Sequence, residues 1–214
     1  MRLKSLVVGV CLFVAAATAA HAEGWYVGGF VTPYTDADDI EFGTALGTVT
    51  TTFEGDMGFG GVVAGREIGS WRVEGEWSAR DFEVEDHILG GAALPGPTGS
   101  LDASSYMVNA IYDFNRDGTV APYLGAGAGW TEVELDDFGV APVPQVLSDD
   151  DSGFAYQLIA GLGFNLGERW NLFVDYRLLV ADGLEVTVTP GAGGVTSEVD
   201  FETQSLQVGA RFRF

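Results

Sequence analysis

The chain has 214 residues, with 31 Asp and Glu against 10 Lys and Arg, a formal net charge of −21, yet 47% of its residues are hydrophobic. Intrinsic disorder combines high charge with low hydrophobicity, so this apolar content argues against it. Nucleic-acid binding needs a basic surface, which this charge excludes for the chain as a whole. The 31 Gly, 14 Phe, 7 Tyr and 5 Trp favour a packed β structure of one domain.

The first 22 residues have the pattern of an export signal. Arg2 and Lys4 precede an apolar run over residues 6–20, which Ala20-His21-Ala22 ends with small residues. This order is typical of a secretory signal peptide. A membrane-spanning helix needs about 20 apolar residues, so a retained anchor is the weaker alternative. We predict a signal peptide over residues 1–22 and a mature barrel domain over residues 23–214, without cysteine and hence without disulfides.

Beyond the signal, apolar and polar residues alternate with the period of a β-strand. The clearest run is residues 206–214, where one face is apolar and the other carries Arg211 and Arg213. Each run can supply the roughly 9–11 residues with which a tilted strand crosses a membrane. We expect eight strands, over Gly24–Tyr34, Asp56–Ile68, Trp71–Phe82, Ala103–Phe114, Val120–Thr131, Gly153–Leu166, Trp170–Val180 and Glu202–Phe214.

The connections between these strands alternate in length. Three are short and rich in turn residues: 69–70, 115–119 and 167–169. Between them lie long polar stretches, at residues 35–55, 83–102, 132–152 and 181–201. This alternation is typical of outer-membrane barrels, whereas a soluble lipocalin-like barrel lacks it. The expected fold is therefore all-β, an eight-stranded antiparallel up-and-down transmembrane β-barrel.

Aromatic residues gather near both ends of the predicted strands, as expected of rings that favour the two membrane interfaces. At the short-turn end we expect Trp25, Trp71, Tyr112, Phe114, Phe164, Trp170, Phe212 and Phe214. Toward the long loops we expect Phe59, Trp77, Tyr106, Trp130, Phe154 and Tyr156.

Six segments, in order and with barrel spacing, resemble the opacity-protein-like outer-membrane β-barrel family, which is related to the transmembrane domain of outer membrane protein A. They are residues 24–29 (GWYVGG), 108–114 (VNAIYDF), 121–127 (APYLGAG), 154–161 (FAYQLIAG), 174–177 (VDYR) and 208–214 (VGARFRF). The resemblance covers essentially the whole mature chain. It implies a surface protein, adhesin or envelope stabiliser of a Gram-negative outer membrane, with Phe214 resembling the terminal signal read by the assembly machinery.

Charges on the polar strand faces are expected to point into the barrel. A barrel of eight strands has room for little more than its own side chains. Ion pairs that close the interior are therefore favoured, and a small channel for ions or small solutes is the alternative. The residues concerned are Arg66, Arg72, Glu74, Glu76, Arg80, Asp175, Arg177, Arg211 and Arg213.

Residues 113–118, Asp-Phe-Asn-Arg-Asp-Gly, fit the opening of a calcium-binding loop. An EF-hand also needs a bidentate Glu at the twelfth position, which is Leu124 here, and flanking helices instead of strands. A tight turn is the favoured interpretation, so we predict no metal site there and no cofactor.

A lipid A-modifying enzyme is a further alternative, because such enzymes are built on small outer-membrane barrels. Their chemistry needs a nucleophile with a base in reach. His87 is the one imidazole after the signal, beside Glu85 and Asp86 in a long loop, with no serine in its strand register. We interpret it as a solvated loop histidine and predict no catalytic residues.

Acidic residues are concentrated on the long-loop side. Residues 35–55, 81–102, 132–151 and 182–202 hold 22 of the 31 acids and no Lys or Arg. The densest runs are residues 36–39 and Asp149-Asp150-Asp151. They form either a solvated, repulsive surface or weak sites for divalent cations that bridge to lipopolysaccharide, since hard cations favour carboxylate oxygens.

Together these observations predict a monomeric integral outer-membrane protein with a structural or surface-interaction role and no catalysis. The expected partners are outer-membrane lipid and lipopolysaccharide, and the assembly machinery through the strand ending in Phe214. Surface ligands or divalent cations are expected at the acidic loops, and nucleic acid is not.

Overall fold

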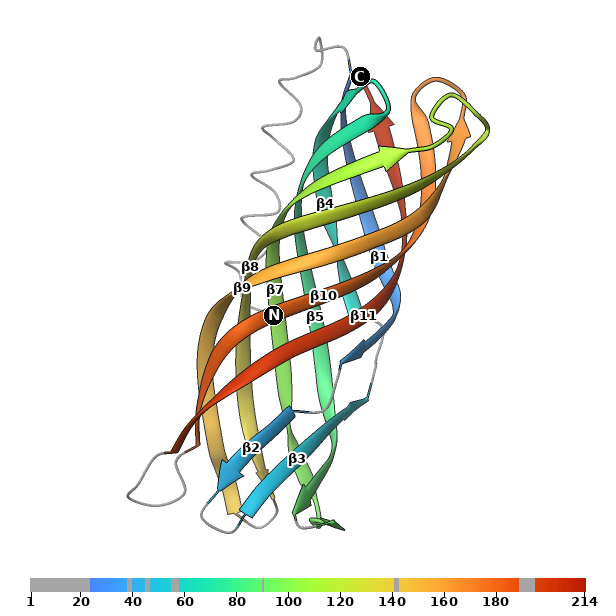
Figure 1. The fold of residues 1–214 in the computed structure, drawn as a ribbon. Coiled ribbons are helices and arrows are strands. Elements are labelled where there is room, and N and C mark those ends of the chain that lie inside the picture. The colour runs from blue at the N-terminus through green and yellow to red at the C-terminus, as the bar shows by residue number, and fades with distance from the viewer. Residues whose placement is uncertain are drawn as a thin grey trace.

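The computed structural model describes residues 24–37, 40–44, 47–54, 58–89, 91–140, 143–188 and 195–214. These residues form eleven strands joined in one sheet (Figure 1). No helix among them is long and apolar enough to cross a membrane. The predicted signal peptide lies outside the described residues.

Eight strands pair into a closed ring, in which every strand is antiparallel to both neighbours. Pairing of the first with the last strand, and of β5 with β7, completes the ring. The predicted eight-stranded antiparallel barrel is therefore confirmed. Its strands are β1 (Trp25–Ala37), β4 (Gly58–Ile68), β5 (Trp71–Leu89), β7 (Pro97–Asp113), β8 (Val120–Val140), β9 (Val143–Leu166), β10 (Trp170–Val188) and β11 (Val195–Arg213).

The short turns lie together at one end of the barrel, at the top of Figure 1. They join β4 to β5, β7 to β8, and β9 to β10, as predicted. Gly69 and Gly167 have φ angles of +63° and +76°, a conformation that favours glycine and that makes these turns tight.

The prediction of long polar loops is wrong, because all four stretches contain strand. β8 and β9 continue to Val140 and Val143, and β2 (Ile40–Thr44) and β3 (Gly47–Glu54) form a hairpin whose second strand pairs with β5. β6 (Ala92–Ala93) also pairs with β5. Beyond the apolar wall the alternation is inverted, with acids such as Glu132 pointing outward and apolar residues such as Phe82 and Val133 pointing inward. The apolar outward face therefore ends while the backbone ladder continues.

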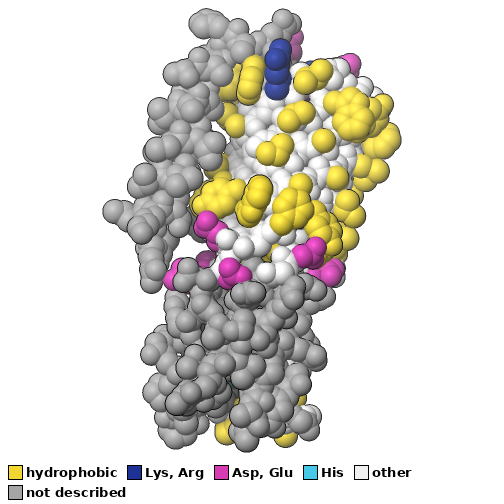
Figure 2. Space-filling view, turned by 60° about the vertical axis from the view of Figure 1, so that its left-hand side comes forward, with side chains coloured by type: hydrophobic (Ala, Val, Ile, Leu, Met, Phe, Trp, Pro, Cys, Tyr) yellow, Lys and Arg dark blue, Asp and Glu magenta, His cyan; other side chains and the backbone are white. Residues whose placement is uncertain are grey.

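The two faces of the wall differ as predicted. Side chains that point outward form an apolar surface, and Figure 2 shows them over the wall with Asp and Glu just beyond one end. Tryptophan and phenylalanine rings are exposed at both ends of this surface, which confirms the two girdles. Trp77 is buried and Phe59 lies outside the described side chains. The exposed rings include Trp25, Trp71, Phe114, Phe164 and Trp170 at the short-turn end, and Tyr106, Trp130, Phe154 and Tyr156 at the other.

Candidate functional site

The interior next to the short-turn end holds a cluster of charges around Glu74. Its Oε2 accepts a hydrogen bond from the Tyr26 hydroxyl at 2.8 Å and lies 3.6 Å from Nε of Arg211. Arg72 binds both carboxylate oxygens of Asp113, at 2.8 and 3.1 Å, and its Nη1 lies 3.9 Å from Glu74. All five residues are buried, so each charge depends on its partners in place of water.

A second cluster surrounds Glu76, the next inward-facing acid along β5. Its Oε2 accepts hydrogen bonds from Arg177, from Asn109 at 2.8 Å and from Gln157 at 3.3 Å. Gln157 also donates to Asn109 at 2.7 Å, and Arg177 donates to Asp175 at 3.0 Å. Because β5 and β10 are not neighbours in the ring, the Arg177–Glu76 pair spans the lumen.

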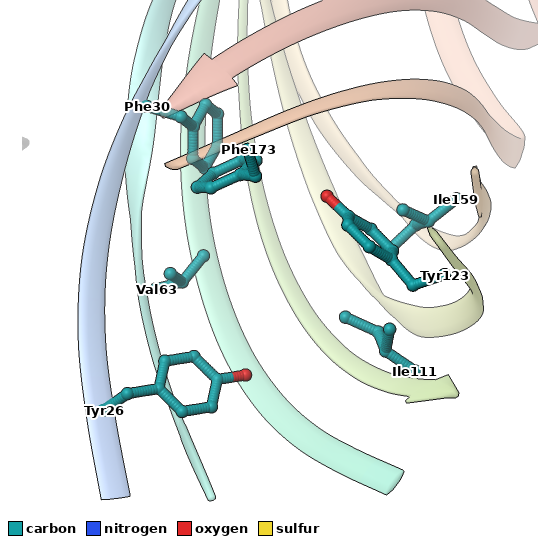
Figure 3. Close-up of a cluster of buried hydrophobic side chains, with 7 residues drawn as sticks. All are labelled: Tyr26, Phe30, Val63, Ile111, Tyr123, Ile159 and Phe173. Atoms are coloured by element: carbon teal, nitrogen blue, oxygen red, sulfur yellow. The ribbon is translucent and has the colours of Figure 1, made fainter. Parts of the chain in front are cut away.

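Aromatic and aliphatic side chains fill the space between these charges (Figure 3). Guanidinium groups stack on several rings: that of Arg211 lies 3.8 Å from the centroid of Phe173, and that of Arg72 lies 4.9 Å from that of Tyr123. The Tyr123 hydroxyl donates to Asp175 at 2.7 Å. The cluster comprises Tyr26, Phe30, Val63, Ile111, Tyr123, Ile159 and Phe173.

Toward the other end the interior becomes a layer of hydroxyl groups around Arg80. Its Nη1 lies 3.3 Å from the Ser78 hydroxyl and 3.4 Å from that of Ser105. Its Nε and Nη2 make no hydrogen bond within the described part of the chain. Beyond this layer Phe82 and Phe201 pack edge to face, with centroids 6.0 Å apart, and close the interior with an apolar layer.

Basic and acidic side chains are equally numerous in the buried interior. Four arginines and four acidic side chains are buried among the described residues, so the interior holds equal numbers of basic and acidic groups although the chain carries −21. A cavity of about 10 Å³ lies beside Tyr26, Arg72 and Tyr123, roughly the space of one water molecule. This arrangement is a plug made of the barrel's own side chains. The eight charges are those of Arg72, Arg80, Arg177, Arg211, Glu74, Glu76, Asp113 and Asp175.

Most of the predicted interior charges are confirmed as inward and buried. The prediction that Arg66 points inward is wrong. Arg66 pairs across from the outward-facing Trp25, and its guanidinium group lies 5.9 Å from the centroid of that ring, on the outer wall. Arg213 is half-buried at the short-turn mouth, where it donates to Glu67 at 2.9 Å. Which face of β4 carries Arg66 follows from the register between β4 and β1, in which Arg66 lies opposite Trp25. The sequence of one strand alone does not show that register.

Several residues of the clusters were not identified as site residues from the sequence. The Asn109 and Gln157 amides and the Tyr26 and Tyr123 hydroxyls complete the charge network. Each lies on the inward face of its strand, so the period-two pattern was the available signal. Their partners belong to other strands, which the pattern of one strand does not reveal.

The prediction of a solvated loop histidine is also wrong. His87 is 4% exposed, with its Nδ1 2.9 Å from the Thr51 hydroxyl and its Nε2 3.3 Å from the Thr98 carbonyl oxygen. β5 continues through this residue, and the β3–β5 register shifts between Val84 and Asp86. Such an irregularity changes which residues face inward, and His87 enters the interior.

The calcium-like segment is a turn, as predicted. Asp113 is occupied by Arg72, and residues 114–119 connect β7 to β8. Asn115 closes the turn by donating from its amide to the Val120 carbonyl at 3.0 Å and by accepting from the Gly118 N–H at 3.0 Å.

Exposed carboxylates form an acidic collar just beyond the long-loop girdle. We define the collar as Asp36, Asp81, Asp102, Glu132 and Asp182, all exposed. Asp81 pairs across from Asp102, and Asp182 across from the girdle residue Phe154. No group of three or more potential ligands gathers for a metal among the described residues. Asp38-Asp39 lie outside the described residues, and the side chains of Asp149 and Asp150 are not described.

Comparison with known proteins agrees with this geometry. Residues 5–214 match the family described as "Outer membrane protein beta-barrel domain". An uncharacterized protein of Brucella abortus is 36% identical over 84 residues, 36% of this chain and 30% of that protein. Outer membrane protein PagN of Salmonella typhimurium is 28% identical over 110 residues, 48% of this chain and 44% of PagN. The matches thus span less than half of these relatives.

Solved structures show the same fold. Neisserial surface protein A, NspA, superposes with a TM-score of 0.56 over 90% of this chain and 98% of NspA, at 18% identity. At that identity the likeness concerns the fold alone.

Proposed function

Since this chain belongs to the outer membrane protein beta-barrel domain family, we propose that it is a closed, non-catalytic barrel of the outer membrane with a structural or surface-interaction role. The observation that carries the proposal is the filled interior. Charges that pair across the lumen, such as Arg177 with Glu76, occupy the space through which a solute would pass. A stable wall with a neutral plug suits a protein that acts through its outer surface.

The same geometry favours this role over a channel. Buried ion pairs cost desolvation free energy, and breaking them leaves uncompensated charges in the interior. Opening a path would separate Glu76 from Arg177 and also displace the packed rings of Phe30 and Phe173. The filled lumen therefore supports a structural role more strongly than it supports conduction of ions or solutes.

The environment of His87 supports a non-catalytic protein. Thr51 is the hydroxyl bound to its Nδ1, and both residues are buried, so a lipid substrate has no access to the pair. A general base needs a reacting group within hydrogen-bond reach. Lipid A from a strain that lacks the protein should have the mass spectrum of the parent strain; altered acylation would favour an enzyme instead.

The acidic collar supplies the proposed surface interaction. We place the short turns in the periplasm and the collar at the level of the lipopolysaccharide headgroups, following the usual orientation of such barrels. Carboxylates there would repel lipopolysaccharide phosphates unless divalent cations bridge them, and hard cations prefer oxygen ligands. The collar would then anchor the barrel to its lipid neighbours.

Calcium titration followed by NMR of the protein in nanodiscs tests the collar. We expect millimolar calcium to shift amide resonances near Asp81, Asp102 and Glu132, because loosely arranged carboxylates bind weakly. The triple variant Asp81→Asn, Asp102→Asn and Glu132→Gln should lose these shifts. Asp117→Asn, an exposed acid at the short-turn end, is the matched control. Unchanged collar resonances in the wild type would remove the cation bridge.

A further inference from the structure

The cavity of about 10 Å³ at the short-turn end has a basic lining. Four arginines border it against two carboxylates, those of Glu67 and Asp113. Two of the arginines are buried, whereas Arg116 and Arg213 have 31% and 23% of their side-chain surface exposed, so an ion can reach the cavity from the short-turn mouth. The four arginines are Arg72, Arg116, Arg211 and Arg213.

The carboxylates of this lining are already occupied. Both oxygens of Asp113 accept hydrogen bonds from Arg72, at 2.8 and 3.1 Å. The oxygens of Glu67 accept from Arg213 at 2.9 Å and from Arg116 at 2.5 Å. A cation or a further hydrogen-bond donor in the cavity would therefore compete with guanidinium groups for its acceptors.

Several donors of the same lining have no acceptor. Nη1 of Arg72 and both Nε and Nη2 of Arg211 are buried and make no hydrogen bond within the described part of the chain. Nη1 of Arg72 and Nε of Arg211 lie 3.9 and 3.6 Å from one Glu74 oxygen, beyond hydrogen-bond distance. The Tyr123 hydroxyl is close to Arg211, but one hydroxyl cannot accept all the N–H protons of three nitrogens. The remaining N–H groups need an acceptor inside the cavity.

We propose that the cavity binds one chloride ion, which accepts hydrogen bonds from Arg72 and Arg211. The cavity holds one species of about the size of water, which fits a monatomic anion and is too small for a phosphate or carboxylate group. Chloride only accepts hydrogen bonds, as a lining with free donors and occupied acceptors requires. The excess of arginines over carboxylates offsets the desolvation of the ion.

The ion would also bring two like charges together. The guanidinium groups of Arg72 and Arg211 lie 4.9 and 5.5 Å from the centroid of the same Tyr123 ring. A chloride between them would reduce their mutual repulsion and fix both side chains at the short-turn end of the plug. The site is independent of the proposed surface interaction, since it lies at the opposite end of the barrel from the acidic collar.

Bromide tests the site in crystals of the refolded protein, because it replaces chloride and scatters X-rays anomalously. We expect one anomalous peak in the cavity, within hydrogen-bond distance of Arg72 and Arg211. A water molecule there, without an anomalous peak, would overturn the proposal.

Urea unfolding in vesicles of zwitterionic phospholipid tests the site without crystals. Chloride is exchanged for gluconate at constant ionic strength, because gluconate is too large for the cavity. An ion that binds only the folded protein stabilises it, so each tenfold rise in chloride above the dissociation constant should raise the ratio of folded to unfolded protein about tenfold. A wild-type protein whose stability is the same in both salts would contradict the site.

Two variants remove the site by different means. Ala121→Val adds methyl groups at a position that lines the cavity, and Ala126→Val, at an exposed position of the same strand, is its matched control. Asn171→Asp keeps the oxygen that accepts from Nη1 of Arg211 at 3.3 Å and adds a negative charge to the lining. We expect Ala121→Val and Asn171→Asp to lose the chloride dependence and Ala126→Val to keep it. Equal chloride dependence in wild type and all three variants would place the ion elsewhere and overturn the proposal.

Discussion

At the scale of single residues, the barrel depends on ionised groups that are protected from water. Glu76 receives three donors on one carboxylate oxygen, and Arg177 divides its donors between Glu76 and Asp175. Buried pairs of this kind add little net stability compared with apolar packing, but removing one member is costly because the other stays charged. They therefore fix which side chains meet in the lumen.

Glu76→Gln tests this dependence. The amide keeps the shape of the side chain but leaves Arg177 with one carboxylate, so the free energy of unfolding should fall by about 3 kcal/mol. Urea unfolding of the protein in lipid vesicles measures it. Glu83→Gln, an exposed acid on the same strand, should change stability by less than about 0.5 kcal/mol. Equal effects of the two substitutions would show that the buried network is not stabilised by its charges.

At the scale of strands, the alternation of residues is sufficient to predict eight membrane strands and most inward faces. It fails where the outward face becomes polar, as beyond Thr131 in β8: Glu132 points outward and Val133 inward, a pattern that resembles a soluble strand or loop and not a membrane-facing one. It also fails at His87, because the register irregularity that precedes it is a property of the β3–β5 pairing.

Substitutions at Gly129 and Gly75 should differ in their effect on stability, because the neighbouring strand approaches Gly129 much more closely. A Cβ on Gly129 would lie 1.9 Å from the Tyr106 carbonyl oxygen and 2.9 Å from the Met107 Cα, so the backbone would have to move. We expect Gly129→Ala to lower the free energy of unfolding by about 2 kcal/mol. Gly75→Ala has open space and should be neutral or slightly stabilising. Unfolding curves of both variants in the same vesicles make the comparison, and a neutral Gly129→Ala would contradict the close strand approach.

At the scale of the molecule, charge and hydrophobicity occupy separate zones. Neutral ion pairs fill the lumen, apolar side chains cover the wall, and the exposed collar carries carboxylates beyond the girdle (Figure 2). The sequence predicts these zones because their periodicity is local. It does not predict the pairs across the lumen, since these depend on the stagger of all eight strands.

Phe214 takes part in closing the ring between β11 and β1, and we propose that it also serves as a signal for assembly. The Phe214 amide donates to the Trp25 carbonyl at 3.0 Å, and its ring packs on Phe212 at 5.6 Å. We expect deletion of Phe214 to lower the amount of protein in the outer membrane, and Phe214→Tyr, which keeps a terminal ring, to restore it. Surface abundance on cells is the measurement. Refolding of the purified deletion variant distinguishes a lost assembly signal from a lost contact, and normal abundance of that variant would contradict the assignment.

Single-channel recording in planar bilayers tests the closed barrel most directly. The plug of ion pairs and rings predicts that pure, refolded protein gives no large or stable openings across the physiological voltage range. Large and stable openings, obtained with the same preparation and absent from bilayers without protein, would contradict the structural role and favour a channel.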